Sequence, residues 1–130
     1  MATQDDIERY IEEGIASLDP KYREKIDNVA ILLEDEPSRE VREREGLGPD
    51  ETLLGLYHGV PLSERGDGYG IGETLPDTIT LYRNPILEEA QETDGDVARV
   101  VRETIWHEFG HYFGLDEHEV RKRERIRDGE

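Results

Sequence analysis

The sequence predicts an α+β fold in which a small sheet of three or four strands packs against helices. The first observation is length, because 130 residues are enough for one modest hydrophobic core and a single domain over residues 1–130. The second is three short apolar or alternating segments, typical of strands, in the middle of the chain. The third is apolar residues at helical spacing on both sides of these segments. A helix, three strands and then further helices together favour a layered α+β domain.

The first part of the chain predicts one helix and one strand. Apolar side chains recur at three and four residues in 3–18, and Thr3 or Asp5 can cap this helix. Residues 28–33, NVAILL, are a short apolar run rich in branched side chains and predict a buried strand. Residues 34–51 are charged and contain two prolines and two glycines, so we predict a loop.

The middle of the chain predicts two more strands and a long connection. Residues 52–59, TLLGLYHG, predict the second strand, and 78–83, TITLYR, alternate as the third strand should. Between them, residues 63–77 carry four glycines without a regular period and are predicted to be a loop. A short helix then follows over 84–92, with Asn84 as its cap and proline in its first turn.

The last part of the chain predicts two helices. One begins after a cap at Asp94 or Asp96 and ends at residue 112 or 113, because its apolar residues repeat at three and four. Gly114 then suits the left-handed conformation that commonly ends a helix. A charged helix is predicted over about 116–127.

Composition narrows the classes of partner and cofactor. The chain has no cysteine, which excludes disulfides, iron–sulfur clusters and thiol catalysis. Its net charge is −17, so repulsion by phosphates argues against a nucleic-acid partner. No apolar run approaches the roughly 20 residues of a membrane span, and the acidic first residues are unlike a secretory signal. We therefore expect no membrane partner and a cytoplasmic location.

The acidic charge itself has two interpretations. Only three of the 16 basic residues are lysines, and the 33 acidic residues are spread along the whole chain. Both features resemble proteins from salt-loving organisms, in whose cytoplasm screening lengths fall to roughly 3 Å or less. This interpretation predicts self-repulsion and poor stability at low salt. The alternative is an interaction protein whose acidic surface binds a basic partner.

A possible metal site lies in TIWHEFGHYFGLDEHEV, residues 104–120, which holds three of the four histidines. His107 and His111 are four residues apart on the predicted helix, so their Cβ atoms lie about 5–6 Å apart on one face. Two such imidazoles can fill two corners of a tetrahedral zinc site. Glu108 lies about 100° around the helix, where it can act as a base on metal-bound water without ligating the ion.

A third protein ligand must come from outside this helix. Gly114 has no Cβ, so it can turn the chain sharply at positive φ and bring the next residues back toward the ion. Three consecutive side chains after it can ligate zinc. They are Asp116, Glu117 and His118.

The stretch HEFGHYFGLDE resembles the HExxHxxGxxD motif of the mini-zincins, a family of small bacterial and archaeal proteins classed as metallopeptidases. Three further segments resemble that family in its order. They are DNVAILLEDEPS (27–38), LLGLYHGVPLSERG (53–66) and LPDTITLYRNPILE (75–88). The resemblance implies a minimal zincin-like fold, with a small mixed sheet, an active-site helix bearing HExxH, and supporting helices.

The resemblance also implies zinc-dependent hydrolysis of a peptide or protein substrate, with Zn²⁺ as the cofactor. The matching positions are His107 and His111 for the two histidine ligands, Glu108 for the general base and Gly114 for the turn. The family's third metal ligand is an aspartate, and here that position holds Glu117, which is one methylene longer. Asp116 and His118 are the alternatives for this third ligand.

Two functions follow as predictions. The first is a zinc metallopeptidase that hydrolyses peptide bonds through a metal-activated water, with Glu108 as general base. Candidates for its oxyanion donor are Tyr112, His118 and Tyr69. The second is a zinc-binding or peptide-binding module with weak or no catalysis, because larger zincins build part of their cleft from a second subdomain. The sequence does not determine the oligomeric state or the cleavage preference.

Overall fold

The computed structural model describes residues 3–61, 65 and 76–115 and confirms the α+β prediction over them. Two helices precede the first strand in this part of the chain, a short helix lies between the first two strands, and two helices follow the third strand. The elements are α1 (Gln4–Ala16), α2 (Pro20–Arg23), β1 (Val29–Glu34), α3 (Arg39–Arg44), β2 (Gly55–His58), β3 (Asp77–Tyr82), α4 (Arg83–Glu92) and α5 (Val97–Tyr112).

The three strands form a mixed sheet in the order β1-β3-β2. The central strand β3 is parallel to β1, with Ile31 opposite Ile79, and antiparallel to β2, with Tyr57 opposite Ile79. Strand β2 is four residues long, and among the described residues it is paired with a strand on one side only. Its other edge is therefore available to contact a helix.

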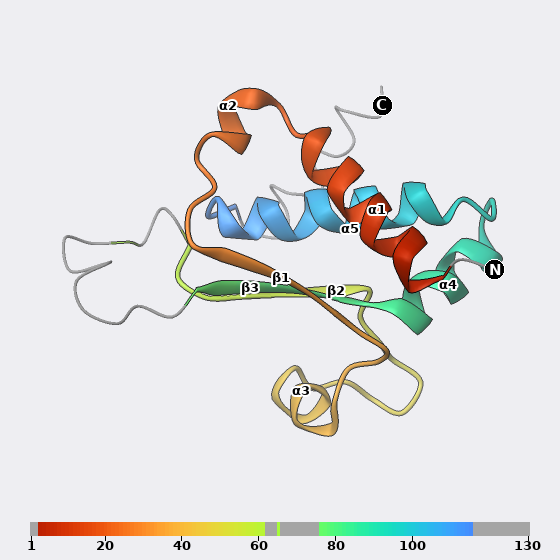
Figure 1. Cartoon of the computed structure of the whole chain (residues 1–130). Coiled ribbons are helices and arrows are strands. Elements are labelled where there is room, and N and C mark those ends of the chain that lie inside the picture. The colour runs from red at the N-terminus through yellow and green to blue at the C-terminus, as the bar shows by residue number, and fades with distance from the viewer. Residues whose placement is uncertain (1–2, 62–64, 66–75, 116–130) are drawn as a thin grey trace.

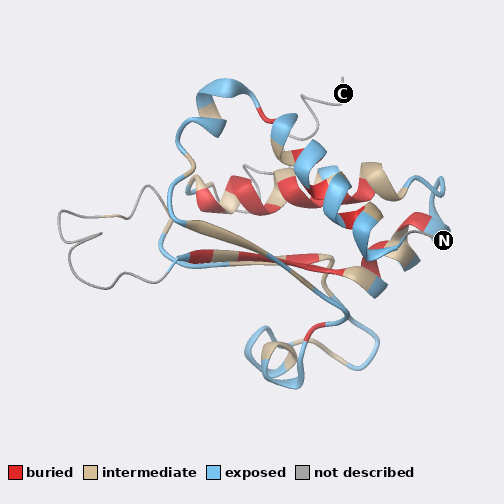
Figure 2. Cartoon of the chain, in the orientation of Figure 1, coloured by how far each residue is buried: buried red, intermediate tan, exposed pale blue. Residues whose placement is uncertain are grey.

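Helix α5 packs against both α1 and the sheet, and α4 contacts α5 as well (Figure 1). In the same view α3 lies on the side of the sheet opposite α1 and α5. Burial is concentrated in β3 and α5, as Figure 2 shows. The core side chains with no exposure include Ile7, Ile79, Leu81, Val101, Ile105 and Tyr112. Burial of this apolar surface holds α5 in place on two sides.

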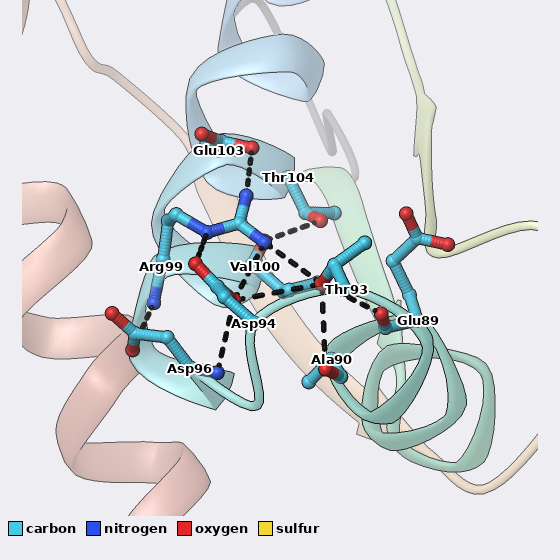
Figure 3. Close-up of polar contacts among 9 residues, drawn as sticks. All are labelled: Glu89, Ala90, Thr93, Asp94, Asp96, Arg99, Val100, Glu103 and Thr104. Carbon is cyan, nitrogen blue, oxygen red and sulfur yellow. Dashed lines mark hydrogen bonds and ion pairs between the residues drawn. The ribbon is translucent and has the colours of Figure 1, made fainter.

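The turn between α4 and α5 is held by a polar cluster around Arg99 (Figure 3). The guanidinium of Arg99 donates from Nε and Nη2 to the two carboxylate oxygens of Asp94, at 2.9 and 3.0 Å. It also donates from Nη1 to Glu103 at 2.8 Å and from Nη2 to the hydroxyl of Thr93 at 3.0 Å. Asp96 caps α5 by accepting the backbone N–H of Arg99. The start of α5 is therefore fixed by side-chain hydrogen bonds as well as by packing.

The Asp94–Arg99 pair predicts a pH-dependent contribution to stability. Hydrogen bonds from Arg99, and then from the backbone N–H of Asp96, lower the pKa of Asp94 from 3.8 to about 2. Because the folded-state pKa is the lower one, the stabilisation is complete above about pH 4 and is lost as the pH falls toward about 2. The difference in free energy of unfolding between wild type and Asp94→Asn should therefore shrink over that range.

Urea unfolding of both proteins at one fixed salt concentration measures this effect, because salt screens an exposed pair. A difference that stays constant from about pH 6 down to about pH 2 would show that the Asp94 carboxylate gains nothing from folding.

The structure corrects the predicted loop 34–51, which contains helix α3. Ser38 caps this helix by accepting the backbone N–H of Val41 at 3.2 Å. Arg42 then donates from Nη2 to the carbonyls of Gly48 and Glu51, at 2.6 and 2.8 Å. The charged residues of this segment thus stabilise a helix and its following turn through backbone contacts, which charge density alone does not reveal.

Helices α4 and α2 also differ from the prediction. Helix α4 begins at Arg83, directly after β3, and its N-cap is Tyr82 instead of Asn84. The backbone N–H of Asn84 donates to the carbonyl of Asp35 at 3.0 Å, so a neighbouring loop replaces the side-chain cap. The short helix α2 was not predicted; Pro20 opens it and Asp19 caps it. The predicted helix over 116–127 lies outside the described residues.

Candidate metal centre

The His-Glu-x-x-His sequence lies in the C-terminal part of α5. Val101, Ile105 and Phe109, on the buried side of this helix, are at most 1% exposed. Because the core holds the helix along its length, the side chains near its end are presented in a defined orientation. His107 and His111 both lie at the edge of this core and are half-buried.

The two imidazole rings come close together. Their centroids are 5.1 Å apart and their planes are inclined at 72°. Two imidazoles that bind one tetrahedral zinc, each with nitrogen at about 2.0–2.1 Å, place their centroids about 5 Å apart. The spacing of His107 and His111 therefore fits a single shared ion.

The end of α5 sets which nitrogen of His111 can bind a metal. Gly114 has φ +91°, and the N–H groups of Gly114 and Leu115 donate to the carbonyls of His111 and Gly110, at 2.9 and 3.0 Å. This is the Schellman arrangement, and the left-handed turn predicted at Gly114 is confirmed. It places the carbonyl of Leu115 3.1 Å from Nδ1 of His111. A carbonyl only accepts, so Nδ1 carries the proton and Nε2 keeps the lone pair that a metal needs.

Glu108 is turned toward the sheet edge. Its side chain belongs to the buried polar residues, with 8% exposure, and its Oε1 accepts the backbone N–H of Tyr57 at 2.8 Å. Tyr57 lies on β2, the edge strand, and its N–H is on the side of β2 that faces away from β3. One carboxylate oxygen of Glu108 is thus held by a strand 51 residues earlier in the chain.

Gly55 allows β2 to approach α5 this closely. A Cβ at Gly55 would lie 2.8 Å from Cγ2 of Thr104 and 3.1 Å from Cδ2 of Leu81. Thr104 precedes Glu108 by one helical turn, and its hydroxyl donates to the carbonyl of Val100, at 2.7 Å. Any larger residue at position 55 would push the strand away from the helix, so this glycine is needed for close packing more than for its backbone freedom.

Sequence reasoning missed two of these contacts, because both involve backbone atoms. Every residue has a backbone carbonyl, and every residue except proline has a backbone N–H, so neither contact leaves a compositional signature. A partial signal was available for the first, because the helix-ending glycine at position 114 predicts where the next carbonyl will lie.

The third-ligand candidates Glu117, Asp116 and His118 lie outside the described residues. Within residues 3–61, 65 and 76–115, no group of three His, Cys, Asp or Glu side chains is arranged to hold a metal ion. A three-ligand site therefore requires a donor from beyond residue 115 or from another segment that the structure does not describe.

Tyr112 is the one proposed oxyanion donor that the structure describes. It lies in the core. Its side chain is fully buried, and its hydroxyl accepts the backbone N–H of Asp27 at 2.8 Å. It also donates to the carbonyl of Asp27 at 3.0 Å. Tyr112 is a core residue that ties α5 to the start of β1. Tyr69 and His118 lie outside the described residues.

Comparison with known protein families identifies the class of this fold and site. A sequence profile described as "Zincin-like metallopeptidase" matches residues 26–126. This range includes all three strands of the sheet and the whole of α5. The chain belongs to the zincin-like metallopeptidase family. No curated protein matches it. As a zincin-like metallopeptidase, the protein is expected to bind zinc and to be a hydrolase, and the matched range spans His107, Glu108, His111 and Glu117.

Two further observations complete the description of this zincin-like protein. His58, the fourth histidine, lies exposed at the end of β2. In the part of the chain that the structure covers, no helix is both long and apolar enough to cross a membrane.

Proposed function

We propose that this protein is a zinc-dependent peptidase that hydrolyses peptide bonds with Glu108 as its general base. The observation that carries the proposal is the paired orientation of His107 and His111, whose rings lie 5.1 Å apart at the end of a core-packed helix. The bond between His111 Nδ1 and the Leu115 carbonyl supports it, because metal-ligating histidines usually donate their second nitrogen in this way.

The proposed ligands are the Nε2 atom of His111, the ring of His107 and the carboxylate of Glu117. Bound zinc would polarise the substrate carbonyl and lower the pKa of a coordinated water from 15.7 to roughly 7. Asp116 and His118 are the competing third ligands. Single alanine variants at positions 116, 117 and 118 rank them, and in this proposal Glu117→Ala has the lowest zinc content.

Glu108 is proposed to move the protons of the reaction. Its carboxylate would take a proton from the attacking water and deliver it to the leaving amine. The N–H of Tyr57 holds Oε1 at 2.8 Å, and this contact limits rotation of the carboxylate before substrate binds. A base whose position is restricted in this way loses less entropy when the reacting groups come together.

Zinc analysis and peptide turnover test the proposal together. The full-length protein, assayed in concentrated salt because of its charge of −17, should contain one zinc and cleave members of a peptide library. Chelation should abolish cleavage, and added zinc should restore it. Cleavage that persists at full rate after zinc has been removed would contradict a metal-dependent mechanism.

The alternative is a zinc-binding or peptide-binding module without turnover. The same assay separates the two functions, because a module would bind one zinc and cleave no peptide. An interaction protein that uses its acidic surface would instead bind its partner independently of zinc, with affinity that falls as salt rises.

A further inference from the structure

A buried carboxylate lies outside the His-Glu-x-x-His sequence, at the first residue of β3. Asp77 is 3% exposed. Its Oδ2 accepts the hydroxyl of Tyr57 at 2.6 Å and Nη2 of Arg65 at 2.9 Å, and its Oδ1 accepts the backbone N–H of Val60 at 3.2 Å. A Cβ at Gly59 would overlap this carboxyl group, so glycine is needed for the chain to pass so close. Buried charge is costly unless paired, and here the pairing links three separate segments.

Arg65 extends this network to helix α5. Its side chain is 7% exposed, and its guanidinium carbon lies 5.1 Å from the ring centroid of Tyr112, a cation–π distance. It also donates from Nη1 to the carbonyl of Asp27 at 3.1 Å and from Nε to that of Val60 at 3.0 Å. Arg65 therefore joins the segment after β2, the start of β1 and the last turn of α5.

Tyr57 joins the network to Glu108. Its hydroxyl donates to Asp77, while its backbone N–H donates to Glu108. Its ring meets that of Tyr112 edge-on, with centroids 6.0 Å apart. Burial and the hydrogen bond to Asp77 raise the pKa of Tyr57, so the hydroxyl stays protonated as a donor over the working pH range. One residue of β2 thus contacts both carboxylates.

Strand β2 depends on these contacts because it is short. It has four residues, and in the part of the chain that the structure describes it pairs only with β3. Its first residue, Gly55, approaches Thr104 on α5 closely. Its last residue, His58, pairs with Thr78 of β3. Asp77 therefore lies one residue beyond the end of the pairing between β2 and β3. The two ends of β2 are therefore held by different means, by helix packing at Gly55 and by the Asp77 network beyond His58.

We propose that Asp77 is a positioning residue, which through Tyr57 and Arg65 holds β2 so that the Tyr57 N–H stays on the Glu108 carboxylate. The inference rests on the proposed function in taking Glu108 as the base. Asp77 touches neither substrate nor metal in this scheme. Its loss should let β2 move relative to α5, which leaves Glu108 less well oriented.

Asp77→Asn tests the proposal in the full-length, zinc-loaded protein. Asparagine keeps the shape but loses the charge that pairs with Arg65. We expect kcat to fall about tenfold or more, with KM changed less than about twofold and one zinc retained, because misplacement of a reacting group affects mainly the chemical step. Amide hydrogen exchange of Tyr57, followed by NMR, should become faster relative to amides of β3.

Asp94→Asn is the matched control, because it makes the same change in another arginine-paired aspartate at the opposite end of α5. It should leave kcat and the exchange of Tyr57 unchanged. Tyr57→Phe is a milder second variant, which removes only the hydroxyl and keeps both the ring and the backbone N–H. It should change kcat and the exchange of its own amide in the same direction as Asp77→Asn, even if the latter folds poorly.

Two results would overturn the proposal. One is an Asp77→Asn protein whose kcat matches that of Asp94→Asn, and the other is an unchanged exchange rate at Tyr57. If wild type bound zinc but cleaved no peptide, the proposed function would fail. The exchange measurement would still decide whether Asp77 holds β2 against Glu108.

Discussion

Replacement of Glu108 with glutamine is expected to lower kcat for peptide hydrolysis by roughly 10²–10⁴-fold, the usual contribution of a general base. An amide cannot take up the proton of the attacking water. Its Oε1 can still accept the N–H of Tyr57, which Glu108 binds at 2.8 Å, so the packing between α5 and β2 should remain. Zinc content should stay at one per chain, because Glu108 is not a ligand in this scheme.

Glu103→Gln provides the matched control for this experiment. Glu103 lies on the same helix, five residues earlier, and pairs with Arg99 instead of contacting β2. The control should lose little stability, as expected for a partly exposed pair, and keep full activity. The kcat values of both variants are compared by steady-state kinetics at equal zinc loading. Peptide cleavage by Glu108→Gln at the wild-type rate would remove Glu108 from the mechanism.

Replacement of His111 with alanine is expected to remove both zinc and activity. The variant loses one of the two imidazoles whose rings lie 5.1 Å apart, and a single histidine with one carboxylate leaves too few ligands for tight tetrahedral binding. It also loses the hydrogen bond to the Leu115 carbonyl, which costs only about 1 kcal/mol. The metal-free protein should therefore fold, while elemental analysis should find far less than one zinc per chain.

His58→Ala is the control for the histidine experiment. His58 is exposed at the end of β2 and does not belong to α5, which carries the ring pair. Its replacement should leave zinc content and peptide cleavage at wild-type values. Equal zinc loss in the two variants would show that the loss is not specific to the ring pair, whereas full zinc retention in His111→Ala would exclude His111 as a ligand.

Much of the local structure could be predicted because it depends on spacing along the chain. The four-residue separation of His107 and His111 places both rings on one helix face whatever surrounds them. Asp96 caps α5, and Gly114 ends it, through contacts that span only a few residues. Helix α3 was missed in spite of its Ser38 cap, because its stability also depends on the contacts of Arg42 with a later turn.

The surroundings of Glu108 could not be predicted in the same way. Its contact with Tyr57 joins a helix to a strand 51 residues earlier and uses a backbone N–H. Asp77 and Arg65 look like ordinary charged residues in the sequence, and only the folded chain buries them together at 2.9 Å. Burial of this kind follows from packing, which no local pattern specifies.

By itself, the sequence therefore determined the helix that carries the two histidines and the glutamate, because helical geometry depends on neighbouring residues alone. It also determined the existence of the three strands, from short segments that are apolar or alternate between apolar and polar residues. Only the tertiary structure decided which groups surround that glutamate. The backbone N–H of Tyr57 contacts its carboxylate, and the Tyr57 hydroxyl contacts the buried Asp77–Arg65 pair, so these positions depend on how β2, β3 and α5 pack together.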